Sequence, residues 1–163
     1  MSRPVPKTNA MRLLDSKGIA YTPVQYDPAI HSGEEVAQVI GEPPERVFKT
    51  LVVVAEGGGF LLVVIPSNHE LELKRCAAAV GVKRVRMATR KEAESKTGLL
   101  AGGISALALT TKPFRVYLDS SAILWDTIYM SAGQRGFNLS LAVDDFLRVT
   151  NATLIELGGS SPE

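Results

Sequence analysis

Apolar residues follow two patterns along this chain, and together they predict an alternation of helices and strands. In four segments the apolar positions recur at intervals of three and four residues, which places them on one face of an α-helix, and a fifth helix, at residues 89–98, is predicted from its end signals alone. Several of these segments begin at a capping residue and end at a glycine, as Thr89 and Gly98 do. The predicted helices cover residues 8–18, 32–40, 67–80, 89–98 and 143–150.

Runs rich in β-branched residues predict strands between these helices. Residues 47–55 and 60–65 are joined by a glycine-rich tip, which is the pattern of a hairpin, and their near-continuous hydrophobicity favours central strands. Further strands are predicted at residues 21–26, 82–87, 114–118, 127–130 and, at an edge, 153–157. We see no internal repeat and no linker, so we expect one α/β domain over residues 1–163, with residues 1–7 and 158–163 as flexible tails.

The composition is typical of a globular protein. The chain has 163 residues, 45% apolar and 21% charged, and its longest unbroken apolar runs are far too short to span a bilayer, so no membrane is expected. It has a single cysteine, and its N-terminus lacks the apolar region of a secretion signal, so we expect a cytoplasmic protein. The formal net charge of +1 gives no general attraction for polyanions but leaves room for a local basic patch.

Candidate nucleophiles and metal ligands are few. Cys76 lies on the apolar stripe of a predicted helix, where burial would raise the pKa of its thiol, so a structural role is favoured. The two histidines, His31 and His69, fall in different segments and lack metal-ligand spacing. The sequence has no G-x-S-x-G nucleophile motif. We therefore expect neither a metal nor another cofactor.

Two glycine-containing segments are candidate binding loops. The pair Gly102-Gly103 lies between apolar residues, so it forms either a pocket wall or a tight packing corner. Residues 133–136, Gly-Gln-Arg-Gly, either present backbone N–H groups and a guanidinium to an anion or form a plain hairpin turn.

A basic run, VKRVRMATRK at residues 82–91, is a candidate contact for nucleic acid. If residues 82–87 form a strand, Arg84 and Arg86 share one face of it. Such a run is usually a solvated surface, so both interpretations stay open.

Lys49 is the most unusual residue of the chain, because it interrupts the apolar run RVFKTLVVV. On a strand it shares one face with Val47 and Leu51, so it stands in an apolar row. Either its side chain extends to solvent at the end of the strand or it lines a cavity. Burial lowers the pKa of a lysine and a bound anion restores the charged form, so a cavity lysine makes sense chiefly with an anionic ligand.

Several short segments, taken in order, resemble the YbaK family of aminoacyl-tRNA editing domains. This family includes bacterial Cys-tRNA(Pro) deacylases and is related to the editing insertion of bacterial prolyl-tRNA synthetase. The resemblance extends over residues 8–157, and the order and spacing of its segments are specific where each alone is weak. The segments are TPVQY at 22–26, EEVA at 34–37, VFKTL at 47–51, GLLAGGIS at 98–105 and TIYMSAGQRG at 127–136.

The resemblance implies a mixed, partly barrel-like β-sheet flanked by helices, with a pocket for the aminoacyl end of a mischarged tRNA. It implies a deacylase that cleaves the ester between the amino acid and the terminal ribose, in trans, with Cys-tRNA(Pro) as the expected substrate and prolyl-tRNA synthetase as a candidate partner. The family supplies no protein nucleophile. The thiol of a cysteinyl substrate attacks its own ester, and relatives use a ribose hydroxyl or water.

The resemblance also assigns site residues. The family's essential lysine falls on Lys49, and its Gly-Gly-Ile-Ser loop falls on residues 102–105. Lys49, Gly102 and Gly103 are the predicted catalytic residues, since backbone N–H groups around the two glycines can stabilise a developing oxyanion. The predicted substrate-binding residues are Tyr26, His31, Ile104, Ser105, Ser131, Gly133 and Arg135.

One segment departs from the family pattern. The family commonly continues its glycine loop as Pro-x-Gly, whereas here Ser105 is followed by Ala106-Leu107-Ala108, which changes the shape of the loop. The change favours an alternative function, a non-catalytic module that uses the same fold to hold tRNA or a synthetase. A protein that binds a small nucleotide through the same lysine and glycines is a third hypothesis.

Overall fold

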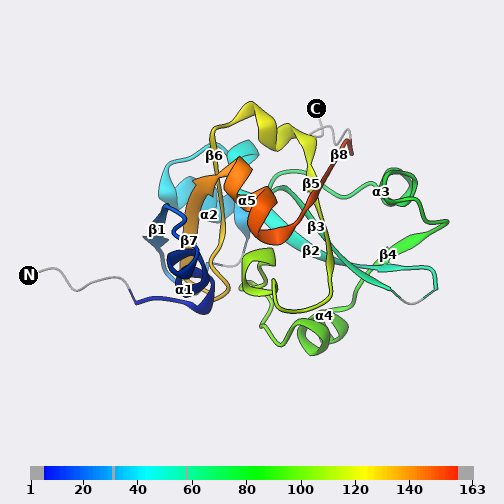
Figure 1. Ribbon diagram of the computed structural model, residues 1–163, viewed down its shortest axis with the longest axis horizontal. Helices are drawn as coiled ribbons and strands as arrows, with labels where there is room; N and C mark the ends of the chain where they lie inside the picture. The colour runs from blue at the N-terminus through cyan, green and yellow to red at the C-terminus, as the bar shows by residue number, and fades with distance from the viewer. Residues whose placement is uncertain (1–5, 31, 58, 158–163) are drawn as a thin grey trace, which may run out of the picture.

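The strands form two sheets. Residues 6–30, 32–57 and 59–157 are described in a computed structural model (Figure 1). The strands are β1 (Tyr21–Gln25), β2 (Phe48–Ala55), β3 (Phe60–Pro66), β4 (Val85–Met87), β5 (Arg115–Asp119), β6 (Thr127–Ser131), β7 (Phe137–Ala142) and β8 (Thr153–Ile155). A three-stranded antiparallel sheet has the order β1-β7-β6, and a mixed five-stranded sheet has the order β4-β2-β3-β5-β8.

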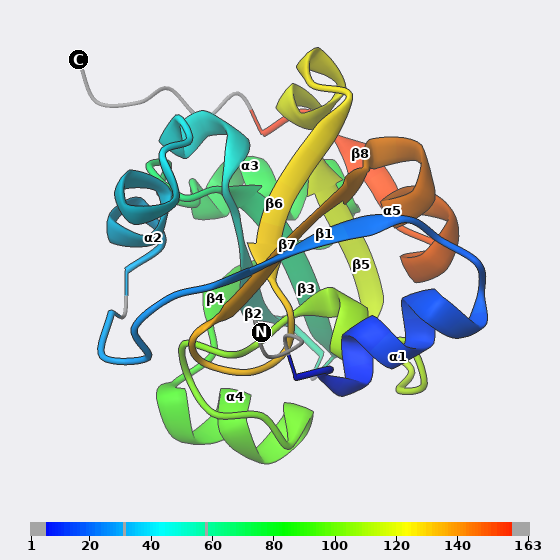
Figure 2. The same cartoon turned by 90° about the vertical axis from the view of Figure 1, so that its left-hand side faces the viewer.

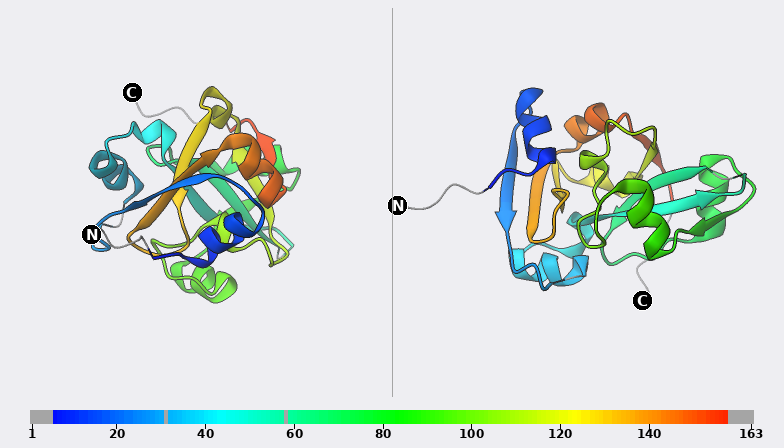
Figure 3. Two further views of the ribbon diagram at one scale, coloured as in Figure 1. Left: turned by 60° about the vertical axis from the view of Figure 1, so that its left-hand side comes forward. Right: turned by 90° about the horizontal axis from the view of Figure 1, so that it is seen from below.

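Helices flank both sheets. They are α1 (Asn9–Ser16), α2 (Gly33–Ile40), α3 (Leu73–Val80), α4 (Arg90–Thr97) and α5 (Val143–Thr150), with short 3-10 turns η1 (Pro44–Arg46), η2 (Ala106–Ala108) and η3 (Ser120–Leu124). Figure 2 shows the three-stranded sheet in front of the five-stranded sheet, and Figure 3 shows α3 beyond the larger sheet, on the side away from the smaller one. No helix in the described ranges is long and apolar enough to cross a bilayer.

Apolar residues fill both faces of the central strands. Leu62 and Val64 of β3 belong to a core shared with Leu139 of β7, which lies between the two sheets. Val63 and Ile65, on the other face of β3, pack with buried Cys76 of α3. The near-continuous hydrophobicity of β2 and β3 thus has a direct cause, because alternate residues of each strand enter different cores.

The two sheets meet at the beginning of β2. Val47 forms an isolated parallel bridge with Tyr129 of β6, and Val47 is buried. The predicted α/β class with helices flanking the strands is confirmed, but the strands form two sheets that are not closed into a barrel. The junction matters for function, because it places the first residues of β2 beside the small sheet.

The main differences between the predicted elements and the structure concern α3, β4 and β7. Helix α3 begins at Leu73 with Glu72 as its N-cap, not at Ser67, because the Ser67 hydroxyl donates a hydrogen bond to the Pro44 carbonyl oxygen over 3.0 Å instead of capping a helix. Strand β4 is confined to Val85–Met87, shorter than predicted. Strand β7 was not predicted, and its hairpin with β6 confirms a turn at residues 133–136. The expected tails at 1–7 and 158–163 lie almost wholly outside the described residues.

Candidate active site

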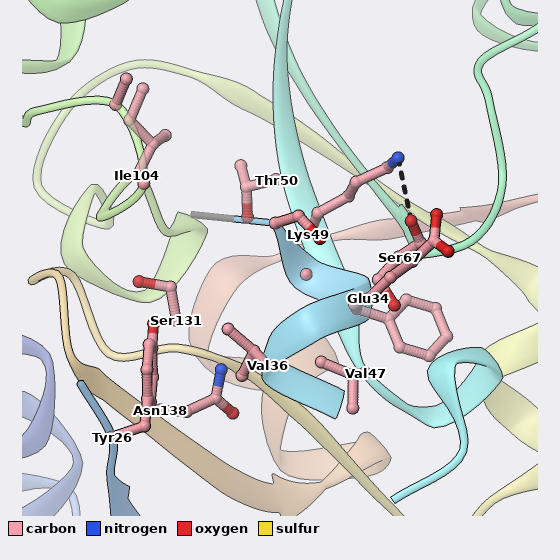
Figure 4. A pocket seen from close by; sticks show the side chains of 15 residues that line it. Tyr26, Glu34, Val36, Val47, Lys49, Thr50, Ser67, Ile104, Ser131 and Asn138 are labelled. Carbon is pink, nitrogen blue, oxygen red and sulfur yellow. Dashed lines mark hydrogen bonds between the residues drawn. The ribbon is translucent and has the colours of Figure 1, made fainter. Parts of the chain in front are cut away.

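A pocket of about 440 Å³ opens where the two sheets meet (Figure 4). Its walls come from the beginning of β2, the first turn of α2, the glycine loop that precedes η2, and the small sheet. The lining residues are Tyr26, Ser32, Gly33, Glu34, Val36, Val47, Phe48, Lys49, Thr50, Ser67, Ala101, Gly102, Ile104, Ser131 and Asn138. Segments distant in sequence therefore contribute to one cavity.

Lys49 lies in this pocket with its side chain half-buried. Its Nζ atom donates a hydrogen bond to the backbone carbonyl oxygen of Ser67 over 3.2 Å. Burial lowers the pKa of Lys49 below its ordinary value, and the carboxylates of Glu34 and Glu70 oppose that shift. Among the described residues, no carboxylate forms a salt bridge with Lys49, so the ammonium group retains donors for an anionic or carbonyl oxygen of a ligand.

The first turn of α2 forms the wall beside Lys49. Ser32 caps the helix by accepting a hydrogen bond from the Glu35 backbone N–H over 3.0 Å. A Cβ atom at Gly33 would lie 2.7 Å from the Ser67 Cβ atom, so only glycine allows the helix to approach this closely. The close approach brings exposed Glu34 to the pocket mouth. The predicted binding residue His31 precedes this turn and lies outside the described residues.

The pair Gly102-Gly103 is both a pocket wall and a packing corner. Gly102 has φ +88° and lines the pocket, whereas Gly103 is buried against the β6–β7 turn. A Cβ atom at Gly103 would lie 3.1 Å from backbone atoms of Gln134 and Arg135. The Gly103 N–H donates to the Leu100 carbonyl oxygen over 2.9 Å, while the Gly102 N–H has no acceptor among the described residues. Of the two, Gly102 is therefore the better placed to donate to a ligand.

Three further predicted residues, Tyr26, Ile104 and Ser131, line the pocket. Burial raises the pKa of Tyr26, and the backbone of Gly136 opposes the shift. The Ser131 hydroxyl oxygen accepts a hydrogen bond from the Gly133 N–H over 3.1 Å, which shapes the turn after β6.

The other predicted residues lie behind the wall. Ser105 is completely buried, and its hydroxyl oxygen accepts a hydrogen bond from the Leu107 N–H over 3.2 Å, which caps η2. Gly133 and Arg135 are also absent from the lining, and Arg135 instead contacts the glycine loop from outside the pocket. These residues shape the pocket in this structure.

Sequence reasoning missed five polar residues of the lining, of which Ser32 is the N-cap of α2 described above. Glu34 of α2, Thr50 of β2 and Ser67, which follows β3, line the pocket because these elements pack around it. The Thr50 hydroxyl oxygen accepts from the Ala106 N–H over 3.4 Å, a donor that a proline at this position would lack. Asn138 lies on the unpredicted strand β7, where the alternation in FNLSLA was the available signal.

Cys76 and the basic run lie elsewhere. The buried Cys76 thiol is in the core beside α3, and burial raises its pKa, as predicted. In the basic run, Arg86 pairs with both oxygens of Glu92 at 2.8 and 2.9 Å, and Arg90 contacts Glu94 at 3.5 Å. Within the described ranges, no group of three or more His, Cys, Asp or Glu residues is arranged to hold a metal ion.

Fold and pocket together define a small mixed α/β protein that places a half-buried lysine opposite a glycine-rich loop. Residues 27–149 match the family described as the aminoacyl-tRNA editing domain, and the chain belongs to this family.

Individual proteins similar to this chain are consistent with its membership of the family. The chain is 38% identical to EbsC of Enterococcus faecalis, named as a proposed Cys-tRNA(Pro)/Cys-tRNA(Cys) deacylase, over 93% of each protein. It is 25% identical to proline–tRNA ligase of Staphylococcus saprophyticus over 69% of this chain, which spans 19% of the ligase. A solved structure described as a proposed trans-editing enzyme for prolyl-tRNA synthetase superposes with a TM-score of 0.79 at 23% identity, covering 93% of this chain and 98% of the other.

Proposed function

We propose that this protein is an aminoacyl-tRNA deacylase that acts in trans on mischarged tRNA, with Cys-tRNA(Pro) as its principal substrate. The observation that carries the proposal is the half-buried Lys49 in a pocket walled by Gly102, in a chain of the editing-domain family. We propose that residues 1–163 act as a single editing domain in the cytoplasm and need no cofactor.

The proposed role of Lys49 is electrostatic. A half-buried ammonium group attracts a phosphate or a developing oxyanion more strongly than an exposed one, because less water screens it. Its pKa is lowered by burial in the free pocket, so a bound anion would favour its charged form. A lysine that remains charged holds the substrate and does not attack the ester itself.

The proposed chemistry uses a nucleophile from the substrate or from water. The described lining residues include no cysteine and no histidine. With a cysteinyl ester, the substrate sulfur forms a bond to its own carbonyl carbon, the bond from that carbon to the ribose oxygen breaks, and the thiol proton passes to the ribose oxygen. The pocket would accelerate this step by holding the reacting groups together while the Gly102 N–H and Lys49 stabilise negative charge on the carbonyl oxygen.

Prolyl-tRNA synthetase is the proposed partner for delivery of tRNA. The support is the match between this chain and part of a proline–tRNA ligase, which places a related domain within a synthetase. The name of one relative carries Cys-tRNA(Cys) as well as Cys-tRNA(Pro), so the amino acid in both is cysteine and the tRNA differs.

A deacylation panel tests the proposal. The protein is incubated with tRNA charged separately with cysteine, alanine, serine and proline, and the released amino acid is measured against tRNA alone. We expect release from Cys-tRNA(Pro) to be fastest. Tight tRNA binding without release from any of the four would favour the non-catalytic module and overturn the proposal.

A further inference from the structure

Asn138 carries a buried amide whose hydrogen-bonding capacity is unmet. It lies on β7, its Cα pairs with Ser131 of β6 and Val24 of β1, and it is 4% exposed. Its Oδ1 atom has no hydrogen-bond partner among the described residues. A buried amide without a partner is costly, so such groups normally find one.

The position of Asn138 indicates where a partner would come from. Figure 4 shows the amide of Asn138 on the wall that also carries Tyr26 and Ser131, and all three line the pocket. The nitrogen of the amide is drawn toward Ser131 and the buried Oδ1 on the opposite side, so a group that enters the pocket meets the amide nitrogen first, and a flip of the amide would present the oxygen instead.

Asn138 is the polar member of the most buried part of the lining, which we call the pocket floor. The most buried lining residues are otherwise apolar, namely Val36, Val47 and Phe48, or already engaged, as is the Ser67 hydroxyl with the Pro44 carbonyl oxygen. Within the described lining, Asn138 is thus the one buried polar side chain with a free hydrogen-bonding atom.

The floor and the rim of the pocket meet different parts of the substrate. Glu34 and Gly102 are exposed at the rim, and Lys49 is half-buried. A tRNA is far larger than the pocket, so it approaches from the rim, and only its terminal group reaches the floor. In a charged tRNA that group is the amino acid. A small side chain that ends in a polar atom fits a floor with three apolar residues and one amide.

We propose, resting on the proposed function, that Asn138 is a specificity residue that hydrogen-bonds to the side chain of the aminoacyl group. An amide both donates and accepts, so it matches a thiol or a hydroxyl, which do the same. A methyl side chain would leave the amide unpaired, so the pocket binds cysteinyl and seryl groups in preference to alanyl groups.

Binding of stable substrate analogues tests this without any cleavage. The probes are 3′-amino-3′-deoxyadenosine joined through an amide bond to cysteine, serine or alanine, and dissociation constants are measured by calorimetry. Asn138→Leu keeps a similar volume and removes the hydrogen bond. We expect it to weaken binding of the cysteinyl and seryl probes by roughly tenfold and of the alanyl probe by less than about threefold.

Two variants serve as controls. Ser140→Ala changes another buried polar residue of β7 that does not line the pocket, and it should leave all three constants unchanged. If Asn138→Leu fails to fold, as judged by circular dichroism, Asn138→Ala replaces it with the same expected selectivity.

The outcomes separate the two proposals. Equal losses for the three probes, no loss for any of them, or no binding of any probe to the unmodified protein would overturn the role of Asn138. Selective binding of the probes by a protein that releases no amino acid from charged tRNA would overturn the proposed function and leave the role of Asn138 in place.

Discussion

The Arg135 Nε atom donates a hydrogen bond to the Ala101 carbonyl oxygen over 2.6 Å and so ties the β6–β7 turn to the glycine loop. The guanidinium group packs where Gly102 has no side chain, since a Cβ atom there would lie 3.1 Å from Arg135 Nε. This contact gives Arg135 a positioning role behind the pocket wall, and Arg135 itself is not among the residues that line the pocket.

Loss of Arg135 should loosen the glycine loop. We expect Arg135→Ala to lower kcat/KM for deacylation by about 10- to 100-fold, because a small displacement of the loop misplaces the Gly102 N–H. Arg135→Lys should recover part of the loss if the lysine reaches the Ala101 carbonyl oxygen. Steady-state kinetics with both variants would check this, and an unchanged kcat/KM in Arg135→Ala would contradict the positioning role.

Gly103 should tolerate no side chain. In Gly103→Ala the new methyl group would lie 3.1 Å from backbone atoms of the facing turn, so the loop and the turn must move apart. We expect a loss of about 1–3 kcal/mol in the free energy of unfolding, together with reduced deacylation. Gly59→Ala is the matched control, because a Cβ atom there meets nothing within 4 Å. Equal stability of the two variants in urea unfolding would contradict the packing account.

Sequence patterns predicted the features that depend on residues close together in the chain. The capping box of Thr89 and Glu92 is present at the start of α4, and Lys49 lies on a strand within an apolar row, as predicted. The same spacing failed at Ser67, because its hydroxyl bonds to Pro44, which lies 23 residues earlier in the chain. Spacing cannot reveal a partner so distant in sequence.

Only part of the candidate site was predicted, because the pocket also depends on contacts between segments distant in sequence. The resemblance pointed to Tyr26, Lys49, Gly102, Ile104 and Ser131, and all of them line one pocket. Asn138 escaped notice because strand β7 was not predicted, and the burial of β7 between β1 and β6 depends on pairing with distant segments.

Cys76 should be dispensable for activity. Its thiol is fully buried against Val63 and its neighbours, outside the pocket lining, and burial raises its pKa. We expect Cys76→Ala to retain the deacylation rate and to lose about 1 kcal/mol in the free energy of unfolding through the small cavity it creates. If the folded variant cleaved only at the background rate, the proposal that the protein supplies no nucleophile would be contradicted.

The charge of Lys49 should give substrate binding a distinct pH dependence. Burial holds the pKa of Lys49 below its ordinary value of 10.5, so the free pocket loses its positive charge at a lower pH than an exposed lysine would. In the unfolded chain Lys49 has its ordinary pKa of 10.5 and holds its proton more tightly than in the folded protein. Its contribution to the free energy of unfolding therefore increases as the pH rises from the lowered pKa towards 10.5.

Binding of an anionic probe should follow the opposite trend. We expect the affinity for a 5′-phosphorylated cysteinyl probe to fall as the pH rises through the lowered pKa. In Lys49→Arg the fall should move to higher pH, because arginine stays charged. Calorimetry across this range provides the comparison, and identical pH profiles for the two proteins would rule out Lys49 as the source of the charge.

Single-turnover cleavage of Cys-tRNA(Pro) by the unmodified protein and by Lys49→Met tests the central claim most directly. Methionine keeps an unbranched side chain in the half-buried site and removes the charge, and Lys112→Ala at an exposed site outside the pocket is the control. The account predicts rapid release of cysteine by the unmodified protein and the control, and a rate lower by about 100-fold or more in Lys49→Met. Undiminished cleavage by Lys49→Met, or no cleavage by the unmodified protein, would contradict it.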